Sequence, residues 1–138
     1  MSPIRILGFI YAAGFFFVAI MGYIPPFVDE NGLLFGLFAL DTYDNSLHGL
    51  SGVWALIAAS ISTRQTILFL KLFGTVYFLD GAMGLALGNA FLDFGIFTNG
   101  IADNSFMTNF FLNVPHIIIG GVAAIGGFFN ARIERAFR

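Results

Sequence analysis

Residues 6–28 read ILGFIYAAGFFFVAIMGYIPPFV, a run of 23 residues without a charged side chain that decides the fold class. The hydrocarbon core of a bilayer is about 30 Å thick, and an α-helix crosses it with about 20 apolar residues. Lipid offers no hydrogen-bond partners to the backbone, so a helix is the form in which such a segment spans a membrane. The run therefore predicts a membrane-spanning helix, which Pro25 and Pro26 end because proline cannot continue a helix.

The composition of the chain supports the same conclusion. Its 138 residues are 58% hydrophobic and 10% charged, with a mean hydropathy of +0.87, whereas about 25% of the residues of a soluble domain are charged. A soluble globule of this size could not bury so much apolar surface. Soluble enzymes, nucleic-acid-binding proteins and disordered tails are therefore excluded, and the lipid bilayer is the expected partner. The absence of cysteine also excludes disulfides and thiolate catalysis.

Three more stretches are long and apolar enough to cross a membrane, although Lys71 and Asp80 interrupt one of them. The expected fold is all-α, with residues 1–138 forming one membrane domain built as a four-transmembrane-helix bundle. The predicted spans cover about residues 5–24, 46–63, 66–88 and 110–130. No serine has a supporting acid or an elbow motif, so we expect no enzyme.

The charged residues predict the orientation of this bundle. With four crossings, the basic residues all fall on one side of the membrane and most acidic residues fall on the other. The basic residues are Arg5, Arg64, Lys71, Arg132, Arg135 and Arg138, and the acidic residues opposite them are Asp29, Glu30, Asp41, Asp44, Asp93 and Asp103. Lysine and arginine residues are retained on the cytoplasmic side of a membrane. We therefore expect cytoplasmic termini, in a bacterial cytoplasmic membrane or an intracytoplasmic photosynthetic membrane.

Two sequence motifs that each occur twice predict an internal duplication. The motif FGLF at residues 35–38 recurs as FGIF at 94–97, and in both copies the tripeptide Asp-Asn-Ser begins nine residues after the first Phe. The motif Asn-x-x-His-x-x-x-Gly also occurs twice. Its two copies are 68 residues apart, whereas the copies of the first motif are 59 residues apart. We therefore expect two parallel helical hairpins, repeat 1 at about 5–63 and repeat 2 at about 64–131, with an insertion near 106–112. The long outer loops are expected to form short interfacial or re-entrant segments.

The repeat places the two histidines, His48 and His116, at equivalent positions. Asn45 and Asn113 precede them by three residues, and an asparagine there predicts a helix cap. Each histidine would then lie in the first turn of its span and head a stripe of small residues, which allow helices to approach closely in lipid.

Three interpretations of these histidines remain open. The favoured one is structural, with each imidazole hydrogen-bonded across helices or to an outer loop. The second is axial ligation of haem or a chlorophyll-type pigment by His48 and His116, because two imidazoles at equal depth suit such a macrocycle. The third is a metal site shared with Asp44 or Asp103; with so few ligands, we predict no metal.

Asp80 is a further candidate because an ionisable side chain inside a membrane is costly and marks a functional site by default. It could carry a proton or face a water-filled pocket, or it could bond to a neighbouring helix or an outer-loop amide. Gly81, Gly84 and Gly88 follow it and predict tight helix packing.

The chain resembles a bacterial family of small four-helix membrane proteins catalogued as a domain of unknown function. The resemblance rests on YIPP after the first span, FGLF in the loop, DNSLH opening the second span, and Tyr77, Gly81 and Gly84 in the third. An Asn-x-x-His motif opens spans two and four of that family. Asp80 and Pro115 depart from its usual pattern. The resemblance implies four helices in a membrane and brings no activity.

The sequence therefore favours a non-enzymatic role. We expect a structural or accessory subunit, either a homo-oligomer or part of a larger membrane complex. The alternative is a haem- or chlorophyll-binding protein for electron transfer or light harvesting. A second alternative is a small transporter or channel that uses Asp80.

Overall fold

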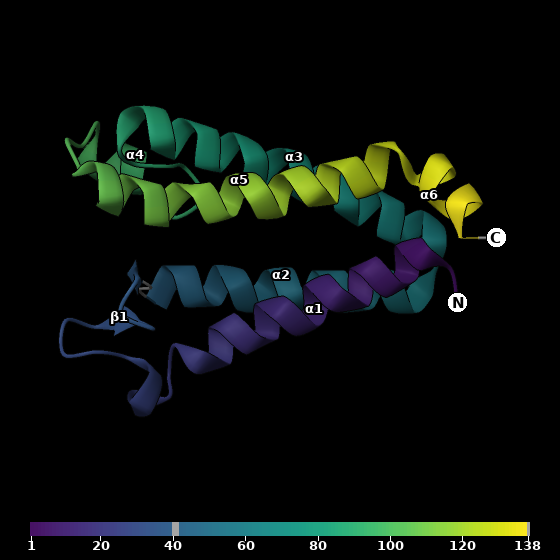
Figure 1. The fold of residues 1–138 in the computed structure, drawn as a ribbon, viewed down its shortest axis with the longest axis horizontal. Coiled ribbons are helices and arrows are strands. Elements are labelled where there is room, and N and C mark those ends of the chain that lie inside the picture. The colour runs from purple at the N-terminus through teal and green to yellow at the C-terminus, as the bar shows by residue number, and fades with distance from the viewer. Residues whose placement is uncertain (40–41, 138) are drawn as a thin grey trace.

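The computed structural model describes residues 1–39 and 42–137, so that Leu40, Asp41 and Arg138 lie outside it, and Figure 1 shows a bundle of long helices. The long helices are α1 (Pro3–Met21), α2 (Thr42–Ile61), α3 (Thr63–Leu87) and α5 (Phe106–Phe128). The short elements are the 3-10 turn η1 (Pro25–Phe27), the strands β1 (Leu33–Leu34) and β2 (Phe38–Ala39), and the helices α4 (Gly95–Asn99) and α6 (Asn130–Ala136).

Three of the long helices, α1, α3 and α5, are long and apolar enough to cross a membrane. This confirms the prediction of a helical protein with apolar helices of membrane-spanning length. Helix α2 has 20 residues, but its first turns carry Asp44, Asn45 and His48, and it does not meet the same criterion of composition.

The long helices form two pairs. Helix α1 packs along α2, and α3 packs along α5, while α2 and α3 make the main contact between the pairs (Figure 1). Helices α1 and α3 begin side by side, because the hydroxyl oxygens of Ser2 and Thr63 lie 3.0 Å apart. The starts of α1 and α3 therefore share one end of the bundle with α6, which contacts α1.

Glycines allow α3 and α5 to approach closely, as the sequence predicts. A Cβ atom at Gly81 would lie 2.7 Å from the carbonyl oxygen of Asn113 and 2.8 Å from the amide nitrogen of Ile117. No side chain larger than hydrogen fits at this distance. Gly84 is likewise buried against Asn113, whereas Gly88, with a φ of 81°, ends α3 in the left-handed conformation.

An aromatic column fills the space between the two pairs. Phe69, Phe73 and Tyr77 follow one another at intervals of four residues on α3, so they share one helical face. Their ring centroids are 5.0 Å and then 4.1 Å apart, and Phe15 of α1 packs 5.1 Å from Phe73. The stripes of small residues are also buried, which brings the backbones of α2 and α5 into the core. Their buried members are Gly52, Ala55 and Ala59 on α2, and Gly120, Ala123 and Gly127 on α5.

The predicted helix caps at Asn45 and Asn113 are wrong. Helix α5 already begins at Phe106, where the Ser105 hydroxyl accepts a hydrogen bond from the Thr108 amide. Asn113 lies inside α5, and its amide donates to the backbone and side-chain oxygens of Asn109. The segment 106–112, where we expected an insertion, is thus the first part of α5. Asn45 likewise lies inside α2, which begins at Thr42.

The first long loop contains strands, which the sequence did not predict. After η1 it forms a two-stranded antiparallel sheet, in which Leu34 pairs with Phe38. The reason is the turn between the strands: Phe35 and Gly36 have φ of 54° and 71° and reverse the chain within three residues. The second long loop does contain a short helix, α4, which has five residues.

Candidate functional site

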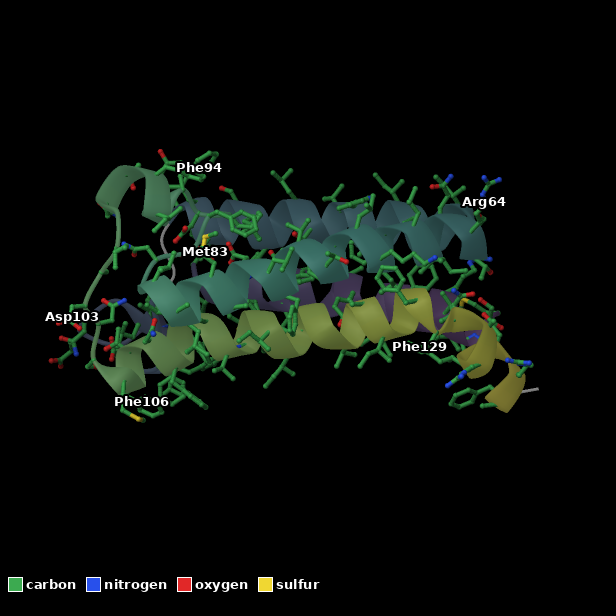
Figure 2. All side chains as sticks on the ribbon, turned by 90° about the horizontal axis from the view of Figure 1, so that it is seen from above. Arg64, Met83, Phe94, Asp103, Phe106 and Phe129 are labelled. Atoms are coloured by element: carbon green, nitrogen blue, oxygen red, sulfur yellow. The ribbon has the colours of Figure 1, made fainter. Side chains whose placement is uncertain are left out.

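The two ends of the bundle differ in charge. Arg64 lies at the end where α1 and α3 begin, and Asp103 lies at the opposite end, which carries both long loops (Figure 2). We call the first the terminal end and the second the loop end. At the terminal end, the Arg5 guanidinium donates to the carbonyl oxygens of Ala59 (2.7 Å) and Ser60 (2.9 Å), where a cation stabilises the last turn of α2.

Asp80 lies at the centre of a group of hydrogen-bonded polar groups at the loop end. Its side chain is only 1% exposed. One carboxylate oxygen accepts the backbone amides of Phe91 (2.9 Å) and Leu92 (2.8 Å), and the other lies 2.7 Å from Nδ1 of His116. Because a carboxylate only accepts hydrogen bonds, Nδ1 of His116 donates and its Nε2 stays available. Asp80 therefore joins the α3–α4 loop to α5.

The local sequence explains how the loop reaches Asp80. Gly88 ends α3 in the left-handed conformation, so the chain turns back over the last turns of the helix. Two asparagines hold the turn in place. Asn104 donates to the Gly88 carbonyl at 2.7 Å, and Asn89 donates to the Gly100 carbonyl at 2.7 Å. The amides of residues 91 and 92 are thereby brought to the carboxylate.

The second histidine, His48, lies close to the first but bonds differently. Its ring stacks on Phe15 at 5.7 Å and meets His116 edge to face at 6.4 Å. It is only 8% exposed, and its Nδ1 makes no hydrogen bond of ordinary geometry within the described chain, although the Asp44 carbonyl faces it one turn earlier. His48 thus keeps unused hydrogen-bonding capacity in a buried position.

Both histidines line one cavity of about 250 Å³ at the loop end. Its walls come from α1, α2, α3, α5 and both long loops, so residues from distant parts of the sequence meet there. The polar lining residues are Asp44, His48, Asp80, Asn89, Asp93, Asn113 and His116, and the aromatic ones are Phe35, Phe38 and Phe111. In the described part of the chain, no lysine or arginine lines this cavity. The cavity is therefore acidic and partly aromatic.

Comparison with known proteins identifies the family of this chain. Residues 5–107 match the model of the family described as Domain of unknown function (DUF4383). The chain belongs to this family. No curated protein and no solved structure matches the chain. The match confirms the resemblance to a domain of unknown function, and it covers α1 to α4 with the start of α5, including His48 and Asp80.

Most of the predicted site residues of this DUF4383 chain meet in the cavity. Asp44 and Asn113 line it together with both histidines and Asp80. Asn45 does not line it; its side chain is buried against Gly22 at the end of α1. Asp103 is exposed at the loop end and lies outside the lining. Within the described residues, no group of three or more histidine, aspartate or glutamate side chains is arranged to hold a metal ion.

Sequence reasoning missed the part of the site that comes from the loops. Asn89 and Asp93 follow α3, and the Asp93 carboxylate accepts the amide of Gly95 at 2.8 Å. A signal was present, because an aspartate two residues before a glycine is typical of a turn held by its own side chain. Phe38 in β2 and Phe111 in α5 both line the cavity, and no periodicity in the sequence relates them.

The cavity of this DUF4383 chain does not fit a haem or chlorophyll macrocycle as it stands. Sites for organic ligands of that kind usually enclose 300–1,000 Å³, and this cavity has about 250 Å³. The rings of His48 and His116 are already in contact across it, at 6.4 Å. The geometry supports a smaller ligand or a structural role for the two imidazoles.

Proposed function

We propose that this DUF4383 chain is a four-span integral membrane protein with a structural or accessory role and no enzymatic activity. The observation that carries the proposal is the saturation of Asp80, whose carboxylate accepts three hydrogen bonds from the protein while being 1% exposed. A buried charge held in this way organises the fold. These hydrogen bonds favour a structural role for Asp80 over a role in binding a transported ion or proton.

The direction of the helices supports a fourth crossing by α2. Helices α1 and α3 are both apolar enough to span, and they begin side by side, with Ser2 and Thr63 in contact at 3.0 Å. If both cross the membrane, the chain must return between them. Helix α2 has 20 residues, a length of about 30 Å, and packs along α1. Its polar residues Asn45 and His48 are buried against neighbouring helices, which keeps them from lipid.

The charge difference between the ends supports cytoplasmic termini. Arg5, Arg64 and Lys71 belong to the terminal end, whereas Asp93 and Asp103 belong to the loops at the other end. Positive residues are retained on the cytoplasmic side of a membrane. We therefore propose that the terminal end is cytoplasmic, in a bacterial cytoplasmic membrane or an intracytoplasmic membrane.

Backbone geometry supports the internal duplication. Phe35 and Phe94 are the two non-glycine residues of the described chain with positive φ, at 54° and 64°. They are the first residues of the two motifs that recur 59 positions apart. A phenylalanine rarely adopts this conformation, so its occurrence at both motifs favours a common origin of the two hairpins.

The remaining buried polar groups support a structural role. The Tyr11 hydroxyl donates to the carbonyl oxygen of Ile119 at 2.6 Å and ties α1 to α5. The Thr66 hydroxyl donates to the carbonyl oxygen of Ser62 at 2.9 Å.

The outward helix faces are apolar, for example at Leu50 on α2, and are available to lipid or to another chain. We propose a homo-oligomer or a subunit of a larger complex.

Cross-linking in native membranes tests the assembly. The chain has no cysteine, so single cysteines can be placed at the outward positions Leu50 and Leu79 and, as a matched control, at the buried Ala55. We expect oxidation to link at least one outward cysteine to a second chain at a level well above the control. Equal, background linking at all three positions, together with a mass of 15.0 kDa by native mass spectrometry, would contradict the proposal.

A further inference from the structure

Within the described residues, His48 and Asn45 each have a buried side-chain atom at the loop end without a hydrogen bond of ordinary geometry, and of the two only His48 lines the cavity. Asp80, Asn113 and His116 are bonded within the protein, whereas Nδ1 of His48 makes no hydrogen bond of ordinary geometry in the described chain and only faces the Asp44 carbonyl one turn earlier. Buried polar atoms are nearly always paired, and an exception calls for an explanation. His48 also lines the cavity of about 250 Å³. A ligand in this cavity would account for the unused capacity of the imidazole.

The charges that line the cavity select a cation. Asp44, Asp80 and Asp93 line it, and no lysine or arginine does so among the described residues. The nearest basic groups along the chain belong to the terminal end, as with Arg64 in Figure 2. A cleft lined by charge of one sign raises the local concentration of the opposite charge. The three carboxylates therefore disfavour a ligand whose group inside the cavity is an anion.

The aromatic lining suits an organic cation rather than a bare ion. Phe38 comes from the first long loop and Phe111 from α5, and their rings meet edge to face at 6.2 Å. The face of a phenyl ring attracts an ammonium group within about 6 Å of its centroid. A neutral imidazole also offers one nitrogen that accepts an ammonium hydrogen, and because Nδ1 of His48 faces the Asp44 carbonyl oxygen and carries the ring hydrogen, that nitrogen is Nε2.

The size of the cavity limits the ligand. A cavity of about 150 Å³ holds a benzene molecule, and on the same scale 250 Å³ holds roughly ten non-hydrogen atoms. We propose that this cavity binds a small organic ammonium group with an apolar body, held between His48, the acidic lining and the phenylalanine rings. This goes beyond the structural role proposed above. The ammonium group could belong to a free amine or to the ethanolamine headgroup of a lipid.

Nuclear magnetic resonance of the imidazole groups can test this directly, because the chain has only two histidines. The protein is reconstituted in nanodiscs of phosphatidylglycerol, which lacks an amine, and titrated with benzylammonium, benzyl alcohol and benzoate. We expect benzylammonium to shift the His48 signal saturably, the isosteric alcohol to bind at least tenfold more weakly, and benzoate not to bind. Equal affinity for the alcohol and the ammonium ion, or no saturable shift, would overturn the proposal.

Two acidic residues provide a matched pair of variants. Asp93 lines the cavity and Asp103 lies outside the lining, and both are exposed residues of the same end. Asp93→Asn is expected to weaken benzylammonium binding at least threefold, and Asp103→Asn to leave it unchanged. An equal loss in both would mean that general surface charge attracts the ion, and it would overturn the site. His48→Phe is expected to abolish binding while the His116 signal stays in place.

The source of the ammonium group is distinguished by the lipid. In nanodiscs of phosphatidylethanolamine, a headgroup in the cavity would shift the His48 signal without added amine and would compete with benzylammonium. A free amine as the ligand predicts the same His48 signal and the same affinity in both lipids. Either result supports ammonium recognition and names its source, whereas binding in neither lipid overturns it.

Discussion

The carboxylate of Asp80 on α3 lies 2.7 Å from the Nδ1 atom of His116 on α5. The other oxygen of the same carboxylate accepts the amides of Phe91 and Leu92. One buried side chain therefore connects two long helices and the loop between them. The stability of the loop end therefore depends on this one carboxylate. Of the two histidines, His116 is bonded to it and His48 is not.

Removal of the Asp80 side chain should destabilise the bundle strongly. The variant Asp80→Ala leaves two amides and the His116 ring without their acceptor in a buried site. Loss of one partner of a buried charged network costs about 3 kcal/mol or more. We expect this decrease in the free energy of unfolding, measured by titration with sodium dodecyl sulfate in mixed micelles.

Two comparisons check the reason for that loss. Asp80→Asn keeps an oxygen that accepts the two amides, so it should cost less than Asp80→Ala. Asp103→Ala removes an exposed carboxylate of the same end and should leave stability unchanged. If Asp103→Ala destabilised the protein as much as Asp80→Ala, the network at Asp80 would not be the cause.

The two histidines should respond differently to the same substitution. His116→Phe leaves one oxygen of the Asp80 carboxylate unpaired in a buried site and should cost about 2 kcal/mol. His48→Phe removes a nitrogen that makes no hydrogen bond of ordinary geometry in the described chain and keeps a ring stacked on Phe15, so it should change stability by less than about 1 kcal/mol. The same unfolding titration compares them, and equal losses would show that His48 is bonded in a way the structure does not contain.

A methyl group at the contact between α3 and α5 should push the helices apart. In Gly81→Ala the new Cβ would lie 2.7 Å from the Asn113 carbonyl oxygen, which costs about 2 kcal/mol through overpacking. The matched control is Gly14→Ala on α1, where nothing lies within 4 Å and the better helix propensity of alanine applies. Thermal unfolding in detergent should show a lower midpoint for the first and an equal or higher midpoint for the second.

The hydroxyl of Tyr11 should be measurable as a tie between the two helix pairs. Tyr11→Phe removes its bond to the Ile119 carbonyl oxygen and keeps the ring, so it should cost about 1 kcal/mol. Tyr43→Phe makes the same change at a residue that is 68% exposed, and no loss is expected. A double-mutant comparison with Asp103→Ala, an exposed site at the loop end, should give additive effects.

The helices could be predicted from the sequence because lipid imposes a simple rule on length and polarity. The run before Pro25 and the stretch around Asp80 are helices as expected, and α1, α3 and α5 are apolar enough to span. The starts of α2 and α5 could not be predicted from Asn45 and Asn113. The true cap of α5 is Ser105, eight residues before Asn113, and an asparagine inside a helix can bond to the previous turn instead.

The composition of the candidate site was only partly predictable. The predicted repeat puts His48 and His116 at equivalent positions, and the structure brings both to one cavity. The partner of His116 could not be assigned, because Asp80 lies 36 residues away and the contact depends on how closely α3 and α5 pack. The strands of the first loop escaped prediction because they depend on a positive φ at Phe35, which apolar composition does not reveal.

Labelling of single cysteines in intact cells tests the central claim, that α2 returns across the membrane between α1 and α3. Cysteines replace Asn31 and Thr98 in the two long loops and Gln65 at the start of α3, in a chain that has none of its own. Four crossings predict that a membrane-impermeant maleimide labels positions 31 and 98 in intact cells and labels position 65 only after lysis. Labelling of positions 31 and 65 from the same side would contradict the account.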